Sequence, residues 1–156
     1  MIDILPVAAA DAGELLTLQR AAYVTEARLY GDPNLPPLVQ TLAELESELA
    51  GSLALKAVAG HRIVGAVRAR VEDGTVHVGR LTVAPDQQGR GVGSRLLDAI
   101  EQASGVAAAA LFTGHLSEGN LRLYIRHGYV ETHRTALRPG VDLVHLRKDL
   151  GAWTSS

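Results

Sequence analysis

A glycine-rich segment between two apolar runs constrains the fold of this chain more than any other feature. The segment reads Asp86-Gln87-Gln88-Gly89-Arg90-Gly91-Val92-Gly93-Ser94, and it separates the strand-like run Val76 to Val83 from the helix-like run Ser94 to Gln102. Three glycines within five positions leave backbone N–H groups unshielded, and the first N–H groups of a helix lack partners within the helix. Because the helix dipole favours negative charge there, the sequence predicts a strand, a phosphate-binding loop and a helix.

Two common phosphate-binding motifs do not fit this segment. A Walker loop requires Gly-Lys followed by Ser or Thr, and the chain has no Gly-Lys pair. A dinucleotide fingerprint requires a glycine at its sixth position, where this segment places Ser94 or Leu96. The spacing that fits is Q-x-x-G-x-G, formed by Gln88, Gly91 and Gly93. A glycine-rich turn without a ligand is the structural alternative.

A second block, from Asn120 to Tyr129, follows the pattern N-x-x-[LA]-Y-x-x-x-G-[FY]. Together with the glycine loop it resembles the coenzyme A-binding region of the GNAT acetyltransferase superfamily, over roughly Val76 to Val130. The resemblance implies a single-domain α/β fold with a mixed sheet, predicted over residues 1–150, with a C-terminal tail at 151–156. In that fold a largely antiparallel central sheet contains one splayed pair of parallel strands and carries helices on both faces.

Apolar patterning gives a coarse order of elements that agrees with a mixed sheet. We predict strands at Ile2 to Val7, Leu53 to Ala59, Ile63 to Val71, Thr75 to Val83, Val106 to Thr113, Tyr129 to Thr135 and Val141 to Arg147. We predict helices at Ser94 to Ala103 and Asn120 to His127, one that Asp11 caps with Glu14 placed as in a capping box, and one that Thr41 caps or opens. The segment Thr25 to Pro37 is rich in Gly, Asp, Asn and Pro, which predicts a loop.

The composition is typical of a globular domain. The chain has 156 residues, of which 47% are hydrophobic and 21% charged, enough for one domain with a sizeable core. A formal net charge of −2 argues against nucleic acid or an anionic membrane as a partner. No apolar run has the length of a membrane span, and no export signal is recognisable. The absence of cysteine excludes disulfides and thiolate sites, and a cytoplasmic location fits these features.

The resemblance implies which residues bind acetyl-CoA. Backbone N–H groups across the glycine loop would hold the pyrophosphate, and the arginine within the loop would add positive charge. The backbone at Leu81 and Val83 matches the strand that pairs with the pantetheine arm and polarises the thioester carbonyl. Asn120 matches a pantetheine contact, and it can equally cap a helix. The implied loop residues are Gln88, Gly89, Arg90, Gly91, Val92, Gly93 and Ser94.

Acetyl transfer to an amine needs a neutral amine and a proton for the departing thiolate. A lysine-like amine has a pKa of about 10.4, so only about 0.04% is neutral at pH 7, and a positioned base contributes on the order of 10²–10⁴-fold. Tyr124 matches the tyrosine commonly assigned as the acid that protonates the thiolate, and it contacts the cofactor in that role. A phenol is neutral at pH 7 and can donate a proton. The alternative role for Tyr124 is core packing on a short helix.

The base has two candidates. His77 lies in the strand before the glycine loop, where several GNAT enzymes place a catalytic Glu or His, and strict alternation would put it on one face with Gly79, Leu81 and Val83. Glu26 lies on the segment that faces the acceptor in this family. Each has a structural alternative as an ordinary surface residue, and base catalysis through ordered water would need neither. Arg80 stands among apolar neighbours, and we expect a carboxylate such as Glu26 or Glu44 to pair with it.

The acceptor would enter beside the first two helices, where Tyr23, Glu26, Tyr30 and Asp32 can face a cationic amine. The sequence therefore predicts an N-acetyltransferase that acts on a primary amine of a small molecule or of a peptide, through a ternary complex. A non-catalytic acyl-CoA sensor is the alternative from another class. No histidine shows the spacing of a metal site, so no metal is expected. Members of the family often form homodimers, but the sequence identifies no interface.

Overall fold

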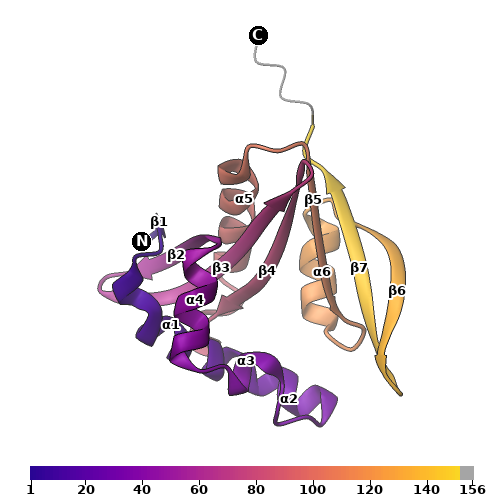
Figure 1. Cartoon of the computed structure of the whole chain (residues 1–156), viewed down its shortest axis with the longest axis horizontal. Coiled ribbons are helices and arrows are strands. Elements are labelled where there is room, and N and C mark those ends of the chain that lie inside the picture. The colour runs from indigo at the N-terminus through magenta and orange to yellow at the C-terminus, as the bar shows by residue number, and fades with distance from the viewer. Residues whose placement is uncertain (152–156) are drawn as a thin grey trace.

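The computed structural model describes residues 1–151 and builds them around a seven-stranded sheet with the order β1-β2-β3-β4-β5-β7-β6 (Figure 1). Neighbouring strands are antiparallel except β4 and β5, which are parallel. The mixed, largely antiparallel sheet expected from the sequence is confirmed. The strands are β1 Ile2–Pro6, β2 Leu53–Ala59, β3 Arg62–Glu72, β4 Thr75–Val83, β5 Ala108–Gly114, β6 Val130–Arg138 and β7 Val141–Asp149. Apart from Gly151, the predicted C-terminal tail lies outside the described residues.

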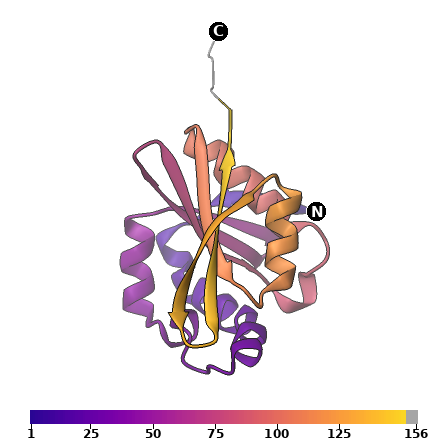
Figure 2. The same ribbon diagram turned by 90° about the vertical axis from the view of Figure 1, so that its right-hand side faces the viewer.

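Helices cover both faces of the sheet, as Figures 1 and 2 show. The Cα of Gly65 in β3 faces Val92 and Leu96 of α5, whereas the side chain of Arg68 reaches α1 and α4 on the opposite face. The helices are α1 Ala12–Ala22, α2 Val24–Tyr30, α3 Pro36–Val39, α4 Leu42–Ala50, α5 Val92–Ser104 and α6 Glu118–Arg126, with short 3-10 turns η1 Ala9–Asp11 and η2 Pro85–Gln87.

The core occupies both faces of the sheet, with Leu15 of α1 and Leu45 of α4 on one face and α5 on the other. Leu96, Leu97 and Ile100 recur at helical spacing on α5 and are fully buried, as are Val67 of β3 and Val76 of β4. Full burial of each such side chain stabilises the fold by roughly 1.5–3 kcal/mol. This packing fixes α5 against β4, and so it fixes the loop that joins them.

The predicted loop from Thr25 to Pro37 is wrong in its first half. Val24–Tyr30 forms α2, because Glu26 to Leu29 are good helix formers despite the turn residues that follow. Gly31 ends α2 with φ at +62°, and a short helix, α3, begins at Pro36. The acceptor side of the fold therefore contains a helix where the sequence predicts a loop.

The two predicted helix starts have different outcomes. Thr41 caps α4 and also forms a capping box with Glu44, because Glu44 N donates to Thr41 Oγ1 (3.2 Å) and Thr41 N donates to Glu44 Oε1 (2.9 Å). The box between Asp11 and Glu14 is wrong. Ala8 N and Lys56 Nζ each donate to Asp11 Oδ2 at 2.7 Å, and Glu14 Oε2 accepts from Ile63 N at 2.7 Å. Both carboxylates thus tie the first helix to the sheet instead of capping it.

Candidate active site

A gap between β4 and β5 is the central feature of the site. The two strands pair at only three positions, the last being His77 with Ala110, although β4 continues to Val83 and β5 to Gly114. Figure 1 shows them diverging toward the glycine loop. The splayed parallel pair expected from the resemblance is confirmed. Beyond His77, the backbone edge of β4 that faces β5 has no strand partner, so its N–H and C=O groups can bind a ligand.

A β-bulge in β4 lies within this unpaired stretch. Arg80 and Leu81 together face the single residue Val67 of β3, because the register runs from Arg68 opposite Gly79 to Ala66 opposite Thr82. Arg80 has φ at +51°, in the left-handed region that residues with side chains rarely adopt. The available sequence signal was Gly79, directly before Arg80, because an isolated glycine within a strand often marks a bulge.

Because of the bulge, the faces predicted for the residues of β4 are partly wrong. His77 and Gly79 share a face, as predicted, because they lie opposite Arg70 and Arg68 of β3. Val83 lies opposite Gly65 and therefore on the other face, beside α5, which strict alternation did not allow. Leu81 and Val83 are half-buried against the core, so their backbone groups are what a ligand can use.

The glycine loop is held open at the start of α5. Gly89 and Gly91 have φ near +80°, and a side chain built at either would meet nothing within 4 Å. Gly91 is the N-cap, so α5 begins at Val92, earlier than predicted, and Val92 itself is only 1% exposed. Gln88 Nε2 donates to Val83 O (3.3 Å), which braces the loop. The fold thus presents bare backbone N–H groups at a helix N-terminus, a suitable seat for a phosphate.

Other loop residues have structural contacts. A side chain at Gly93 would come within 3.3 Å of Leu123, so this glycine permits α5 to pack closely on α6. Arg90 is exposed and makes no hydrogen bond with any part of the chain that the structure describes. Asp86 forms a two-bond ion pair with Arg62, with both N–O distances at 2.7 Å, which anchors the start of the loop to β3.

Ser94, in the first turn of α5, joins a network that sequence analysis missed. Its Oγ lies 2.7 Å from Nε2 of His127, and His127 Nδ1 lies 3.3 Å from Oδ1 of Asp98. His127 follows α6, so the contact links the two helices at the loop. The only sequence signal was the i, i+4 spacing of Ser94 and Asp98 on one helix face. The network orients a hydroxyl beside the proposed phosphate seat.

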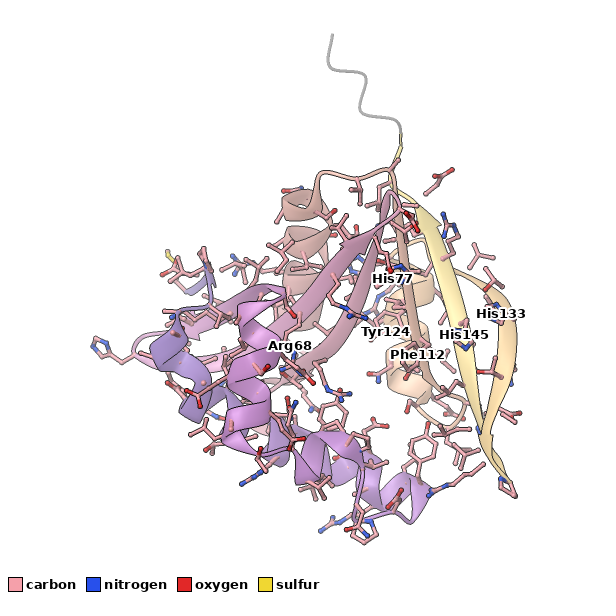
Figure 3. The ribbon with its side chains drawn as sticks, in the orientation of Figure 1. Arg68, His77, Phe112, Tyr124, His133 and His145 are labelled. Carbon is pink, nitrogen blue, oxygen red and sulfur yellow. The ribbon has the colours of Figure 1, made fainter. Side chains whose placement is uncertain are left out.

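Tyr124 lies on α6 and, as Figure 3 shows, points into the gap between the diverging strands. Only 6% of the residue is exposed. Burial raises the pKa of Tyr124 well above its usual value, and Tyr23 and Glu26 raise it further. These two residues come from the opposite side of the gap, so helices on both sides meet at Tyr124. The phenol stays protonated throughout the physiological pH range.

Glu26 belongs to a chain of hydrogen bonds that joins α2 to the turn before α6. Ser117 Oγ donates to Glu26 Oε2 (2.6 Å), and the Tyr30 hydroxyl lies 2.7 Å from the same Oγ. Leu116 N in turn donates to the Tyr30 hydroxyl oxygen at 3.1 Å. One carboxylate oxygen of Glu26 is thereby engaged. This chain fixes α2 as the floor of the gap.

The other acceptor-side residues proposed from the sequence divide into two groups. Tyr30 and Asp32 support the structure, because Arg138 of β6 donates to Asp32 Oδ2 (2.9 Å) and to Tyr30 O (3.1 Å). Tyr23 belongs to the site: burial raises its pKa, and the charge of Arg80 opposes that rise. Tyr23 is therefore a near neighbour of both Arg80 and Tyr124.

Asn120 does not cap a helix. Ser117 is the N-cap of α6, and the Asn120 side chain donates to Thr113 Oγ1 (3.3 Å) from the helix's first turn. This contact fixes the amide beside β5, on the boundary of the gap. Its predicted contact with pantetheine stays a prediction.

The expected pairing of Arg80 with Glu26 or Glu44 is wrong. Glu44 caps α4, Glu26 accepts from Ser117, and neither forms an ion pair with Arg80. The nearby Arg68 has partners instead: its Nη2 donates to Glu48 Oε2 (2.9 Å) and its Nη1 to Gln19 Oε1 (3.3 Å). Burial lowers the pKa of Arg68, while Glu48 opposes that effect and Arg80 adds to it.

His77 is exposed and lies where β4 and β5 begin to separate (Figure 3). Its ring makes no hydrogen bond within the stretch 1–151. Tyr129, by contrast, is only 2% exposed and donates to Glu101 Oε2 (2.7 Å), so the second aromatic of the block serves core packing. The structure thus brings Tyr124, Tyr23 and Glu26 together and leaves His77 at the upper end of the gap.

These features define an acetyltransferase of the GNAT class, and a family model described as "Acetyltransferase (GNAT) domain" matches residues 36–150. The chain belongs to this family, and it is an acyltransferase. It is 29% identical over 133 residues to YjcF of Bacillus subtilis, an uncharacterized N-acetyltransferase, over 85% of this chain and 92% of that protein.

Solved structures agree on the fold. The PaiA N-acetyltransferase of Thermoplasma acidophilum, in complex with coenzyme A, has a TM-score of 0.81 at 18% identity, with 96% of this chain and 99% of that chain covered. The ribosomal-protein-S18-alanine N-acetyltransferase of Escherichia coli has a TM-score of 0.79 at 16% identity, with 97% and 95% covered.

Over residues 1–151, no helix combines the length and the apolar character needed to cross a membrane. Within that same range, no three His, Asp or Glu side chains gather in a way that could hold a metal ion.

Proposed function

We propose that this protein transfers the acetyl group of acetyl-CoA to a primary amine of a small molecule, by direct attack within a ternary complex. The observation that carries the proposal is the gap between β4 and β5. At one end it has a glycine loop that opens onto α5, and beside it lies the buried hydroxyl-bearing side chain of Tyr124. The proposed cofactor seat and the proposed proton donor thus both lie beside the point where these two strands separate.

Acetyl-CoA fits the groups that line this region. The open N-terminus of α5, from Gly89 to Ser94, suits the pyrophosphate, since a side chain at Gly89 or Gly91 would project into empty space. The unpaired edge of β4 at Leu81 and Val83 suits the amides of the pantetheine arm. Arg90 would add charge from the exposed side of the loop, and Ser94 a hydroxyl. Acetyl-CoA supplies the activated acetyl group.

Tyr124 would act as the acid. Its raised pKa keeps a proton on the phenol at neutral pH, so the hydroxyl can donate to the thiolate that leaves as the amide bond forms. The same burial excludes water from the thioester and reduces wasteful hydrolysis.

His77 would act as the base. It lies on the same face of the sheet as the acceptor-side helices, and its ring is free of hydrogen bonds to the chain from residue 1 to residue 151. Glu26 is less free, because Ser117 donates to one of its oxygens. We assign Glu26 to positioning α2 and to attracting the acceptor's ammonium group before it loses its proton.

A small acceptor fits the floor of the gap better than a peptide. Hydrogen bonds from Tyr30 and Glu26 to Ser117 join α2 to the turn before α6 and close the lower end of the opening. An extended peptide would need that end open. A cytoplasmic location, where acetyl-CoA is available, is part of the same proposal.

The test is release of the CoA thiol from acetyl-CoA with a panel of small amines and peptides, read with a thiol-reactive dye. The chain has no cysteine and gives no background. Release that depends on a small amine, with intersecting two-substrate kinetics, supports the proposal. Binding of acetyl-CoA without release for any acceptor favours the sensor, and release only with peptides favours a peptide acetyltransferase.

A further inference from the structure

Arg80 is a half-buried cation without an anionic partner in the described chain. Its Nε is buried and has no hydrogen-bond partner, the hydroxyl of its hydrogen-bonding neighbour Tyr23 is neutral, and no carboxylate of residues 1–151 forms an ion pair with the guanidinium. The arginines with no ion pair or hydrogen bond at all within that range, Arg28, Arg70, Arg90 and Arg126, are all exposed. A charge taken out of water without a partner destabilises the fold, so this arrangement needs an explanation.

The backbone at Arg80 is unusual as well. The residue is in the left-handed region at φ +51°, within the bulge of β4. Backbone strain of this kind persists where the surrounding fold imposes it, and it concentrates at ligand sites. The bulge displaces the side chain from the regular alternation of the strand and turns it toward the helices on the acceptor side, where Gln19 and Arg68 line the same small cavity.

The surroundings place Arg80 at the reaction gap. Tyr23 is a close neighbour of Arg80 and also of Tyr124, so one side chain joins the guanidinium to the proposed acid. Glu26 faces the same two tyrosines from α2. The acceptor side therefore has a cation at Arg80 and an anion at Glu26, separated by Tyr23.

The charges around Arg80 do not cancel. Arg68 lies nearby, but Glu48 neutralises it through the 2.9 Å ion pair. One positive charge without an ion-pair partner among residues 1–151 remains, on a planar group whose buried Nε has no hydrogen-bond partner. That geometry matches a carboxylate, which is planar and carries one charge. A phosphate, with nearly two charges, would leave negative charge in excess.

We propose that Arg80 binds a carboxylate of the acceptor, so that the acceptor is a small amino acid-like molecule with an amine and a carboxylate. Its ammonium group approaches Glu26 while its carboxylate meets the Nη nitrogens of Arg80, and the zwitterion spans Tyr23. This inference rests on the proposed acetyl transfer, and it assigns to Arg80 the choice of substrate.

The test compares matched acceptors: an amino acid, its carboxamide, the amine that remains when the carboxylate is removed, and a phosphorylated amine. With wild type, kcat/KM for the amino acid should exceed that for the carboxamide and the plain amine by about 10-fold or more. In Arg80→Gln the KM for the amino acid should rise about 10- to 100-fold, while the KM for the plain amine stays within twofold. Arg80→Lys should retain part of the preference, because it keeps the charge.

Arg28→Gln is the matched control, because it removes an exposed, unpaired arginine of α2 and should leave the preference intact. The CoA affinity of Arg80→Gln checks its fold. If that variant does not fold, the acceptor preferences of wild type and Arg80→Lys test the inference instead. Equal use of the matched acceptors by wild type, a preference that survives in Arg80→Gln, or a stronger preference for the phosphorylated amine would each overturn the inference.

Failure of acetyl transfer itself is distinguishable. If no acceptor is acetylated, binding of the amino acid in the presence of CoA is measured by calorimetry. Binding to wild type that Arg80→Gln loses supports the carboxylate site even though the transfer proposal fails. No binding of the amino acid to wild type overturns the carboxylate site as well.

Discussion

The two sides of the gap between β4 and β5 are built in different ways. On the cofactor side the proposed ligand groups are backbone: the open loop around Gly89 and Gly91, and the unpaired edge of β4. On the acceptor side the proposed ligand groups are side chains from separate elements, namely Tyr23, Glu26 and Arg80. A backbone site depends on where glycine stands in the sequence, whereas a side-chain site depends on how distant elements pack. The first can be inherited across a whole family, and the second can differ between its members.

The largest expected effect would break the cofactor side. In Gly91→Trp a bulky side chain occupies the loop where the phosphates would bind, and acetyl-CoA affinity should fall by about 100-fold or more, as expected for losing two charge-assisted hydrogen bonds. Calorimetric titration with acetyl-CoA measures it. Gly140→Trp is the control, since Gly140 has φ at +82° and equally open space but lies in the turn between β6 and β7. Equal affinity in the two variants would remove the cofactor site from the loop.

The second effect separates chemistry from binding. Tyr124→Phe removes the proposed proton donor and should lower kcat by about 100-fold, at the low end of general acid catalysis, with acetyl-CoA affinity nearly unchanged. Tyr129→Phe, in the same sequence block, should lower stability through loss of its bond to Glu101 but leave kcat close to wild type. A Tyr124→Phe enzyme that turns over like wild type would exclude the acid role.

The pH dependence tests the base. Because burial raises the pKa of Tyr124, its donor form persists to high pH, and the rate should not fall on its account below about pH 10. In the pH–rate profile, a rising limb at lower pH should then arise from the base. This limb should disappear or move in His77→Ala but persist in Glu26→Gln. Stopped-time assays from pH 5 to 10 measure both profiles. A limb unchanged in His77→Ala but altered in Glu26→Gln would reverse the two assignments.

The smallest expected effect is on stability, and it comes from Asp11, which lies outside both sides of the gap. Burial raises the pKa of Asp11, but hydrogen bonds from Lys56 and Ala8 outweigh it and lower the pKa overall. A carboxylate whose pKa is lower in the folded than in the unfolded state stabilises the fold at pH values above its unfolded-state pKa of about 3.9. This stabilisation is lost as the pH falls through the folded-state pKa. The free energy of unfolding of Asp11→Asn should therefore be up to about 1 kcal/mol lower than that of wild type at neutral pH. On acidification it should fall less than that of wild type. Thermal unfolding between pH 2 and 7 measures it, and kcat should not change.

The strand, the glycine loop and the helix on the cofactor side could be predicted from the sequence because the relevant physics is local. Glycines at fixed spacing, a preceding apolar run and a following amphipathic helix suffice to predict a phosphate-binding loop, and the splayed parallel pair follows from the family resemblance. The bulge at Arg80 was missed although Gly79 precedes it, because one glycine in a strand only suggests a bulge and the register with β3 locates it. The helix at Val24–Tyr30 was missed for a related reason, since turn residues after it dominated the pattern.

The site residues divide along the same line. Tyr124 could be named from its motif, and the structure places it in the gap. The link from Ser94 to His127 and Asp98 could not, because it joins two helices that are distant in sequence. The same holds for Ser117, whose contacts with Glu26 and Tyr30 connect residues about 90 positions apart. Side-chain networks between elements can be identified only once the fold is known.

A crystal structure of the protein with coenzyme A tests the central claim most directly. We expect the pyrophosphate to lie on the backbone N–H groups between Gly89 and Ser94. The pantetheine arm should run along β4 from Val83 toward Leu81, with the thiol within hydrogen-bond reach of the Tyr124 hydroxyl. Coenzyme A bound outside the gap between β4 and β5, or a thiol directed away from Tyr124, would contradict it.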